Sequence, residues 1–358
     1  MVAMRWSRWG SLAVLLMTFA TLVACSSNSV PAGTIGSIPH DSVPAETIGS
    51  IPHGSIPVNS FTESLAQVRI GDKWGFIDQS GKFVINPQFD DIYSFTESLA
   101  PVLVGDKWGF IDKSGKFVIN PQFDDPVSFT EGLALVRVGD KWGFIDKSGI
   151  FVINPQFDDA DSFSEGLALV RVGDKWGFID KSGKIVINPQ FADARDFSEG
   201  LAIVTVGGKG GFDGKNGFID KSGKFVINPQ FDFASNFSEG LARVLVGGRG
   251  GFGGGGEFGG KNGFIDKSGK IVINPQFDYA YSFTEGLALV RVGDKWGFID
   301  KSEKIVINPQ FDYADSFTEG LARVYVGDKW GFIDKSGKIV INPQFDDASN
   351  FGKNRDRG

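Results

Sequence analysis

Residues 163–196 read FSEGLALVRVGDKWGFIDKSGKIVINPQFADARD, and this 34-residue stretch recurs along most of the chain. Its Trp-Gly pair returns at the same place in six copies, at Trp74, Trp108, Trp142, Trp176, Trp296 and Trp330. Asn216 and Asn262 take the tryptophan position in two further copies, where the preceding loop is longer by six and by twelve residues. The sequence therefore contains eight tandem copies between residues 61 and 351.

Three short apolar runs in each copy are separated by turn residues. In the copy quoted above they are 167–172, 175–180 and 184–188. Gly-Asp follows the first run and suits a two-residue hairpin, and Asp-Lys-Ser-Gly between the other two suits a capped type I turn. Pro189 has no amide to donate, so we expect the third run to stop before it. Without sustained helical periodicity, the pattern predicts an all-β meander of three strands, with room for a short fourth strand around Phe191.

The first run is apolar on both faces. Leu167 and Leu169 point one way, while Ala168, Val170 and Val172 point the other. A strand of this kind needs cover on both faces, which one meander cannot supply, so neighbouring copies must stack on each other. Eight blades lie within the range of β-propellers, and we prefer a closed, propeller-like ring, with an open β-solenoid array as the alternative.

The repeated motif resembles a known family. Lys-Trp-Gly-Phe-Ile-Asp, followed by Ser-Gly-Lys and then Asn-Pro-Gln-Phe, is similar to the WG-repeat (KWG repeat) of bacterial proteins. The resemblance covers about four-fifths of the chain, and the copies with Asn216 and Asn262 depart from it. It implies a β-repeat domain in proteins that are often exported, and it implies no settled activity.

The first residues have the three parts of a secretion signal. Arg5 and Arg8 precede the apolar run 11–23, which is too short to span a bilayer as a helix. The run ends in Leu-Val-Ala-Cys, which resembles a bacterial lipobox and implies cleavage before Cys25 and lipidation of its sulfur. Because several acyl chains give stable anchoring, we expect an exported cell-envelope lipoprotein held to the membrane through Cys25, in the outer membrane if the host has one.

Four segments follow from these patterns. They are a signal peptide at 1–24, a lipidated cysteine and Ser/Pro/Gly-rich tether at 25–60, the repeats at 61–351, and a polar tail at 352–358.

Composition excludes several kinds of chemistry. Charged residues make up 22% of the chain, are of both signs and are interspersed, with a net charge of −7, so we expect no nucleic-acid partner. Cys25 is the only cysteine, and both histidines, His40 and His53, precede the repeats. The repeats therefore cannot form a Ser-His-Asp or Cys-His nucleophile or the usual zinc site, and we expect no metal and no cofactor.

Recurrent carboxylates are expected to be structural. Glu165 and Asp180 have counterparts in all eight copies, whereas a catalytic pair is needed only once. The aspartate pair Asp158-Asp159 and its counterparts offer oxygen ligands to calcium, but solvated loop carboxylates are the simpler interpretation. At Glu303 the turn glycine is lost, which predicts either local strain of about 1 kcal/mol or a changed turn.

Two features leave the function open. The tryptophans are interpreted as core anchors whose glycine admits a neighbouring aromatic ring, and the alternative is a row of exposed rings that stack on sugars. The Gly-rich inserts 207–215 and 247–261 are either binding loops or neutral expansions. We expect a non-enzymatic, membrane-anchored scaffold for a protein or cell-envelope polymer, with a glycan-binding module and a propeller-type hydrolase as alternatives.

Overall fold

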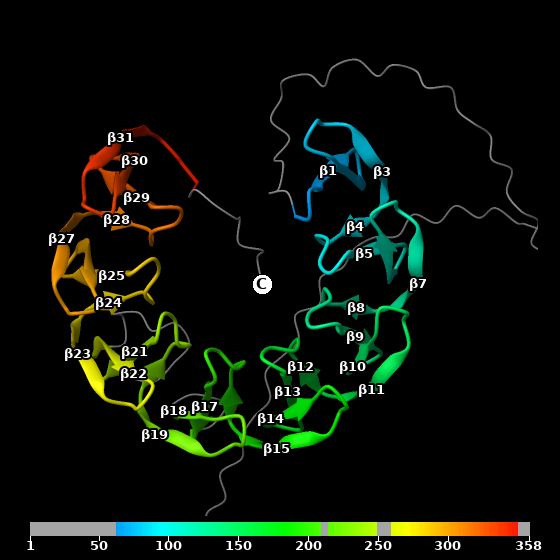
Figure 1. Cartoon of the computed structure of the whole chain (residues 1–358), viewed down its shortest axis with the longest axis horizontal. Coiled ribbons are helices and arrows are strands. Elements are labelled where there is room, and N and C mark those ends of the chain that lie inside the picture. Colours follow the sequence, from blue (N-terminus) through cyan, green and yellow to red (C-terminus); the bar gives the residue numbers. More distant parts are fainter. Residues whose placement is uncertain (1–61, 209–213, 249–258, 350–358) are drawn as a thin grey trace, which may run out of the picture. The chain divides into compact units, whose positions relative to one another are not determined.

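The computed structural model describes residues 62–208, 214–248 and 259–349. These residues form strands and turns, arranged as eight small antiparallel sheets that follow one another in chain order (Figure 1). The all-β prediction and the count of eight repeats are confirmed. The predicted signal peptide 1–24, Cys25, the 25–60 tether and the 352–358 tail lie outside the described residues.

We number the sheets 1 to 8 along the chain. Sheets 1 to 4 consist of β1 (Ala66–Ile70), β2 (Lys73–Ile77) and β3 (Phe83–Phe89); β4 (Asp91–Ile92), β5 (Leu99–Val104), β6 (Lys107–Asp112) and β7 (Phe117–Phe123); β8 (Asp125–Pro126), β9 (Ala134–Val138), β10 (Lys141–Ile145) and β11 (Phe151–Phe157); and β12 (Asp159–Ala160), β13 (Leu167–Val172), β14 (Lys175–Asp180) and β15 (Ile185–Phe191).

Sheets 5 to 8 consist of β16 (Asp193–Ala194), β17 (Ala202–Val206), β18 (Lys215–Ile219) and β19 (Phe225–Phe231); β20 (Phe233–Ala234), β21 (Leu241–Val246), β22 (Lys261–Asp266) and β23 (Ile271–Phe277); β24 (Tyr279–Ala280), β25 (Leu287–Val292), β26 (Lys295–Asp300) and β27 (Ile305–Phe311); and β28 (Tyr313–Ala314), β29 (Leu321–Val326), β30 (Lys329–Asp334) and β31 (Ile339–Phe345). The Gly-rich inserts lie between the second and third strands of their sheets, β17 and β18 or β21 and β22, except that Lys215 and Lys261, which we assigned to the inserts, begin β18 and β22. Residues 209–213 and 249–258 of the inserts lie outside the described ranges.

Sheets and sequence copies are out of phase. The copy at 163–196 supplies the last three strands of sheet 4, and its own end, β16, becomes the first strand of sheet 5. The short fourth strand therefore exists, but it lies after Phe191 and belongs to the next sheet. Each of the first seven copies therefore crosses one junction between sheets. The strand that it donates pairs with the next copy, so main-chain hydrogen bonds as well as side-chain contacts join neighbouring copies.

The third apolar run does not stop at the proline, contrary to our prediction. β15 continues through Pro189 to Phe191. Its pairing with β14 shifts between Trp176↔Phe191 and Phe178↔Ile187, which marks a β-bulge. β15 is also the edge strand of sheet 4, so no further strand needs a hydrogen bond from the amide that Pro189 lacks.

The hydrophobic cores lie between sheets, as the two-faced strands predicted. Leu167 and Leu169 pack in one cluster with Ala202 of sheet 5. Ala168, on the opposite face, packs with Phe144 of sheet 3. Each internal sheet is therefore covered on both sides by its siblings, and burial of these side chains stabilises the junctions.

Turn residues behave as the sequence predicted. Gly173 has a φ of +64°, the sign that a two-residue hairpin with glycine in its first loop position requires. Asp180 Oδ1 accepts hydrogen bonds from the amide of Ser182 at 2.9 Å and from that of Lys184 at 3.1 Å. Glu303, which replaces the turn glycine, is held at a φ of +69°, so the expected backbone strain is present.

Contacts between sheets run in chain order. Among the described strands, no extensive contact joins sheet 8 to sheet 1, so the closed ring that we preferred is not seen. The array is propeller-like in that seven of its sheets have four antiparallel strands. Within the described ranges, no helix is long and apolar enough to cross a bilayer.

Candidate interaction surface

The six tryptophans of the motif pack against the neighbouring strand. In sheet 4, Trp176 pairs with Arg171 on one side and with Phe191 on the other, and the guanidinium carbon lies 5.7 Å from the centre of the indole ring. Trp108 and Trp296 are only 8% and 7% exposed. The other four are half-buried: Trp74, Trp142, Trp176 and Trp330.

The glycine after the tryptophan is required by close backbone packing. A Cβ atom on Gly177 would lie 2.5 Å from the carbonyl oxygen of Ile187 and 2.6 Å from the nitrogen of Pro189. The bulged third strand therefore crosses directly over this position. Our expectation that an aromatic ring approaches the glycine was wrong, because the main chain of the next strand fills that space.

Asparagine at the tryptophan position makes hydrogen bonds instead of ring contacts. Asn216 Nδ2 donates to the carbonyl oxygen of Asp232 at 3.5 Å. Asn262 is fully buried, donates to the carbonyl oxygen of Asp278 at 3.1 Å, and accepts from the guanidinium of Arg243 at 3.3 Å. These two copies thus hold the next sheet through amide contacts.

The recurrent glutamates join neighbouring copies. Glu165 accepts a hydrogen bond from the amide of Gly200 at 3.0 Å and forms an ion pair with Lys221 at 3.2 Å, both from the next copy. The Glu–Lys pairs of this kind are Glu63–Lys113, Glu97–Lys147, Glu131–Lys181, Glu165–Lys221, Glu199–Lys267, Glu239–Lys301 and Glu285–Lys335. Their hydrogen bonds agree with the structural role that the sequence predicted for them.

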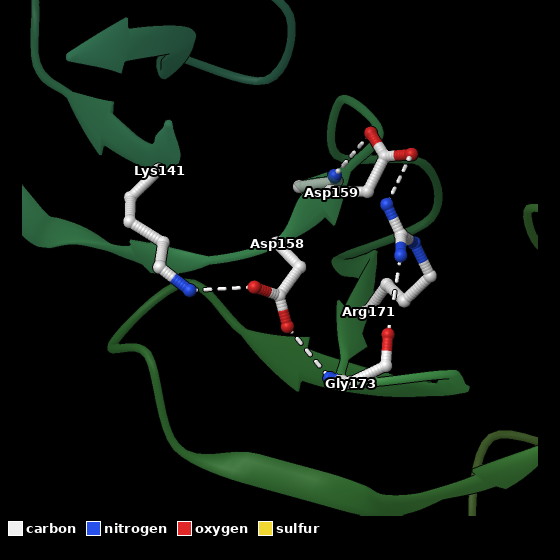
Figure 2. Close-up of polar contacts among 6 residues, drawn as sticks. Lys141, Asp158, Asp159, Arg171 and Gly173 are labelled. Atoms are coloured by element: carbon white, nitrogen blue, oxygen red, sulfur yellow. Dashed lines mark hydrogen bonds and ion pairs between the residues drawn. The ribbon is translucent and has the colours of Figure 1, made fainter. Parts of the chain in front are cut away.

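The aspartate pairs are also engaged with neighbouring residues (Figure 2). Asp158 accepts from Lys141 Nζ at 2.5 Å and from the amide of Gly173 at 2.6 Å, and the hydrogen bond from Lys141 keeps the pKa of Asp158 below its ordinary value. Asp159 lies 3.4 Å from the guanidinium of Arg171. In the part of the chain that the structure describes, no three metal-ligating side chains gather, so these pairs form no calcium cluster there.

One buried carboxyl lies apart from this pattern. Asp196 follows β16, and its Oδ1 atom is buried without a hydrogen bond. Burial, together with the nearby charge of Asp161, raises the pKa of Asp196 to about 7. A carboxyl of this kind makes the stability of the junction between sheets 4 and 5 depend on pH.

Sheets 7 and 8 carry a continuous group of aromatic rings that we call the aromatic row. Its ring centres are separated by 5.7 Å between Tyr279 and Trp296, 6.0 Å between Trp296 and Tyr313, and 5.7 Å between Tyr313 and Trp330. Tyr281 lies against Trp296 at 5.8 Å and belongs to the same group. The row replaces carboxylates, since Tyr279 and Tyr313 stand where other copies have aspartates such as Asp159.

Reasoning from the sequence missed this surface. Four of the five tyrosines of the chain fall between residues 279 and 325, the last being Tyr325, whose ring centre lies 4.9 Å from that of Trp330. This uneven distribution was the available signal. What it did not show is that Tyr279 lies opposite Arg291 on the next strand of sheet 7.

Repeated small antiparallel sheets, one for each copy, define a propeller-like β-repeat array. A family model described as the WG containing repeat matches residues 74–108, 108–142, 142–176, 176–209, 217–249, 263–296, 296–330 and 330–355. The chain therefore belongs to the WG-repeat family. The comparison with curated proteins gives no significant match.

One solved structure agrees with the fold, and two others have lower TM-scores. A eukaryotic initiation factor is 11% identical with a TM-score of 0.53, over 80% of this chain and 90% of the other. The dihydro-heme d1 dehydrogenase NirN is 15% identical with a TM-score of 0.40, over 78% and 74% of the two chains. Hsv2 of Kluyveromyces marxianus is 10% identical with a TM-score of 0.37, over 70% and 96%. Only the first of these likenesses bears on the fold, and it concerns the fold alone.

Proposed function

We propose that this protein is a non-enzymatic scaffold whose β-repeat array binds a protein or a cell-envelope polymer while Cys25 anchors it to a membrane. The aromatic row is the observation that carries the binding role. Tyrosine, tryptophan and arginine are the side chains that contribute most to protein interfaces, and here they gather on consecutive sheets. Membership of a β-repeat family supports the same role.

The recurrent carboxylates support a scaffold rather than an enzyme. Glu165 and its counterparts in the six other copies that have a following copy bind a lysine and an amide of that copy, and Asp158 binds Lys141 and Gly173. Carboxylates bound in this way hold sheets together. A general acid or base instead needs an open position toward a substrate and a pKa near the working pH.

Binding is tested with the full-length chain in nonionic detergent as bait in a cross-linking pull-down from envelope extract. We expect a defined partner that is retained by the chain and not by an unrelated lipoprotein. A variant in which 207–214 and 247–260 are each shortened to the two-residue loop of the template, with Lys215 and Lys261 kept, shows whether the inserts contribute. Retention of no partner above that background would contradict the scaffold role.

Anchoring and location rest on the lipobox-like segment that ends at Cys25. We expect labelled palmitate to be incorporated into the wild-type protein in a bacterial host and the protein to sediment with envelope membranes. Cys25→Ser removes the sulfur that would carry the lipid, so both label and sedimentation should be lost. A labelled Cys25→Ser protein would disprove lipidation at this residue.

A further inference from the structure

Sheets 4 and 7 carry the same arginine in different surroundings. In sheet 4, Arg171 lies opposite Asp159 and donates to the carboxylate at 3.4 Å and to the carbonyl oxygen of Gly173 at 3.1 Å (Figure 2). Its guanidinium lies over the ring of Trp176. Asp159 thus neutralises the cation on the aromatic surface.

In sheet 7 that carboxylate is replaced by a ring. Arg291 lies opposite Tyr279, and its guanidinium carbon is 5.7 Å from the ring centre of Trp296, the same separation as in sheet 4. Its Nε atom is buried without a hydrogen bond. Within the described ranges, no carboxylate forms an ion pair with Arg291, so the cation is left without the partner that its counterpart has.

The carboxylates that precede Tyr279 and Tyr313 in the chain are already engaged, although the charge of Arg291, in addition to the hydrogen bond from Lys261, does help to lower the pKa of Asp278. Asp278 accepts hydrogen bonds from Lys261 and from the amide of Gly293, the latter at 2.7 Å. Asp312 pairs with Lys295. Neither is hydrogen-bonded to the guanidinium. Among the described residues, the guanidinium of Arg291 therefore has no carboxylate hydrogen-bonded to it, and a carboxylate is the group that satisfies a guanidinium best.

The surroundings of Arg291 indicate what kind of molecule would supply this carboxylate. Tyr313 is 39% exposed, while Trp296 is nearly covered. Tyr279 and Tyr313 meet Trp296 at interplanar angles of 69° and 63°. The rings therefore form an uneven, edge-on surface and no flat platform for stacking a sugar. Such a surface suits the side chains of a peptide.

We propose that Arg291, with Tyr279 opposite it and with Tyr281 and Tyr313 packed against Trp296, the ring its guanidinium lies over, is the docking point for an acidic segment of a partner protein. An aspartate or glutamate of the partner occupies the place that Asp159 fills in sheet 4, and an apolar neighbour packs on the exposed ring of Tyr313. The assignment rests on the proposed scaffold function and names the chemistry of its partner.

The probe is a fluorescein-labelled peptide of alternating glutamate and phenylalanine, and its twin has glutamine in place of glutamate. Binding to the full-length chain in nonionic detergent is followed by fluorescence anisotropy. We expect the acidic peptide to bind, with an affinity that falls as the salt concentration is raised. The glutamine twin should bind about ten- to a hundredfold more weakly.

Two variants follow the template found in other sheets of this chain. Tyr279→Asp supplies the carboxylate that Arg171 has in sheet 4, so Arg291 becomes satisfied internally. Arg291→Leu introduces the residue that sheet 2 has at Leu103. Both variants should keep the fold, which circular dichroism checks. Both should bind the acidic peptide about tenfold or more weakly than the wild type. Arg171→Leu removes an arginine that already has its carboxylate, and it should leave binding unchanged.

Three results would overturn the assignment. The first is equal affinity for the acidic peptide and its glutamine twin. The second is that folded Tyr279→Asp binds the acidic peptide as tightly as the wild type. The third is that Arg171→Leu loses as much affinity for the acidic peptide as Arg291→Leu. If polygalacturonate binds the protein and the acidic peptide does not, the ligand of this surface is an acidic glycan instead. If the envelope partner is retained equally by wild type and Tyr279→Asp, the scaffold function holds and this docking point is wrong, which separates the two proposals.

Discussion

Replacing the glycine of the Trp-Gly pair with alanine tests how the sheets are built. Gly177→Ala adds one methyl group at a position where the carbonyl oxygen of Ile187 and the nitrogen of Pro189 would lie 2.5 and 2.6 Å away. Both are main-chain atoms, so no side-chain rotation relieves the overlap. Gly177 does not have a positive φ, so alanine adds no conformational strain of its own and the effect is purely steric.

The size of the effect follows from the space required. Ordinary carbon contacts lie at about 3.5 to 4 Å, so β14 and β15 must separate by roughly 1 Å. Overpacking in a rigid core costs about 1 to 3 kcal/mol, and main-chain neighbours place this change at the upper end. We expect a loss of about 3 kcal/mol, concentrated in sheet 4 and its two junctions because contacts are local in a repeat array.

Hydrogen exchange measured by mass spectrometry on the full-length chain in detergent reports this loss. Amides of β14 and β15 should exchange about a hundredfold faster, as 1.4 kcal/mol corresponds to a factor of ten. Gly173→Ala is the control: its φ is +64° and no atom lies within 4 Å of its Cβ position, so only about 1 kcal/mol is expected. If Gly177→Ala lowers the stability of sheet 4 by no more than this control, the close approach of the third strand is not the reason for glycine at position 177.

Three further changes test the turns and the buried carboxyl. Glu303→Gly removes a side chain from a backbone at φ +69° and should stabilise sheet 7 by about 1 kcal/mol. The amides of β26 and β27 should then exchange more slowly, and unchanged exchange rates would argue against strain at this turn. Because Asp196 has a pKa of about 7 in the folded chain against an ordinary 3.8, the folded state binds the proton more tightly, and stability should fall as pH rises from about 4 to above 7. Asp196→Asn should reduce this slope in urea midpoints, leaving the part that comes from Asp161, whose pKa is also raised by burial, and a wild-type midpoint that rises over the same range would refute the assignment. Asp180→Ala removes the acceptor of two turn amides and should cost about 1 to 2 kcal/mol, whereas Asp174→Ala, at an exposed carboxylate, should change stability by less than about 0.5 kcal/mol.

The strands and turns were predictable because each depends on residues close in sequence. Gly173 marks a hairpin through its conformational freedom, and Asp180 caps the turn that follows. The two-faced first strand, with Leu167 and Ala168 pointing to opposite neighbours, showed that copies must stack. The expected family follows from the same motif and is confirmed by the family match.

The errors concern contacts that local reasoning does not contain. Pro189 was interpreted as a strand end because its missing amide is evident in sequence, whereas the bulge and the edge position that accommodate it depend on pairing with β14. Gly177 was assigned to the wrong neighbour for the same reason. Arg291 was not recognised, because its partner Tyr279 comes from the preceding copy and meets it only through the offset between copy and sheet.

That offset also governs how the array changes in length. An in-frame loss of 34 residues that begins anywhere between residues 129 and 163 rejoins the chain at equivalent positions, so the donated first strand and the glutamate with its lysine are regenerated at the new boundary. Recombination between near-identical copies can therefore shorten or extend the protein without a defective joint. Each event alters how many sheets separate Cys25 from Arg291 along the chain, while the chemistry at each of these residues stays the same.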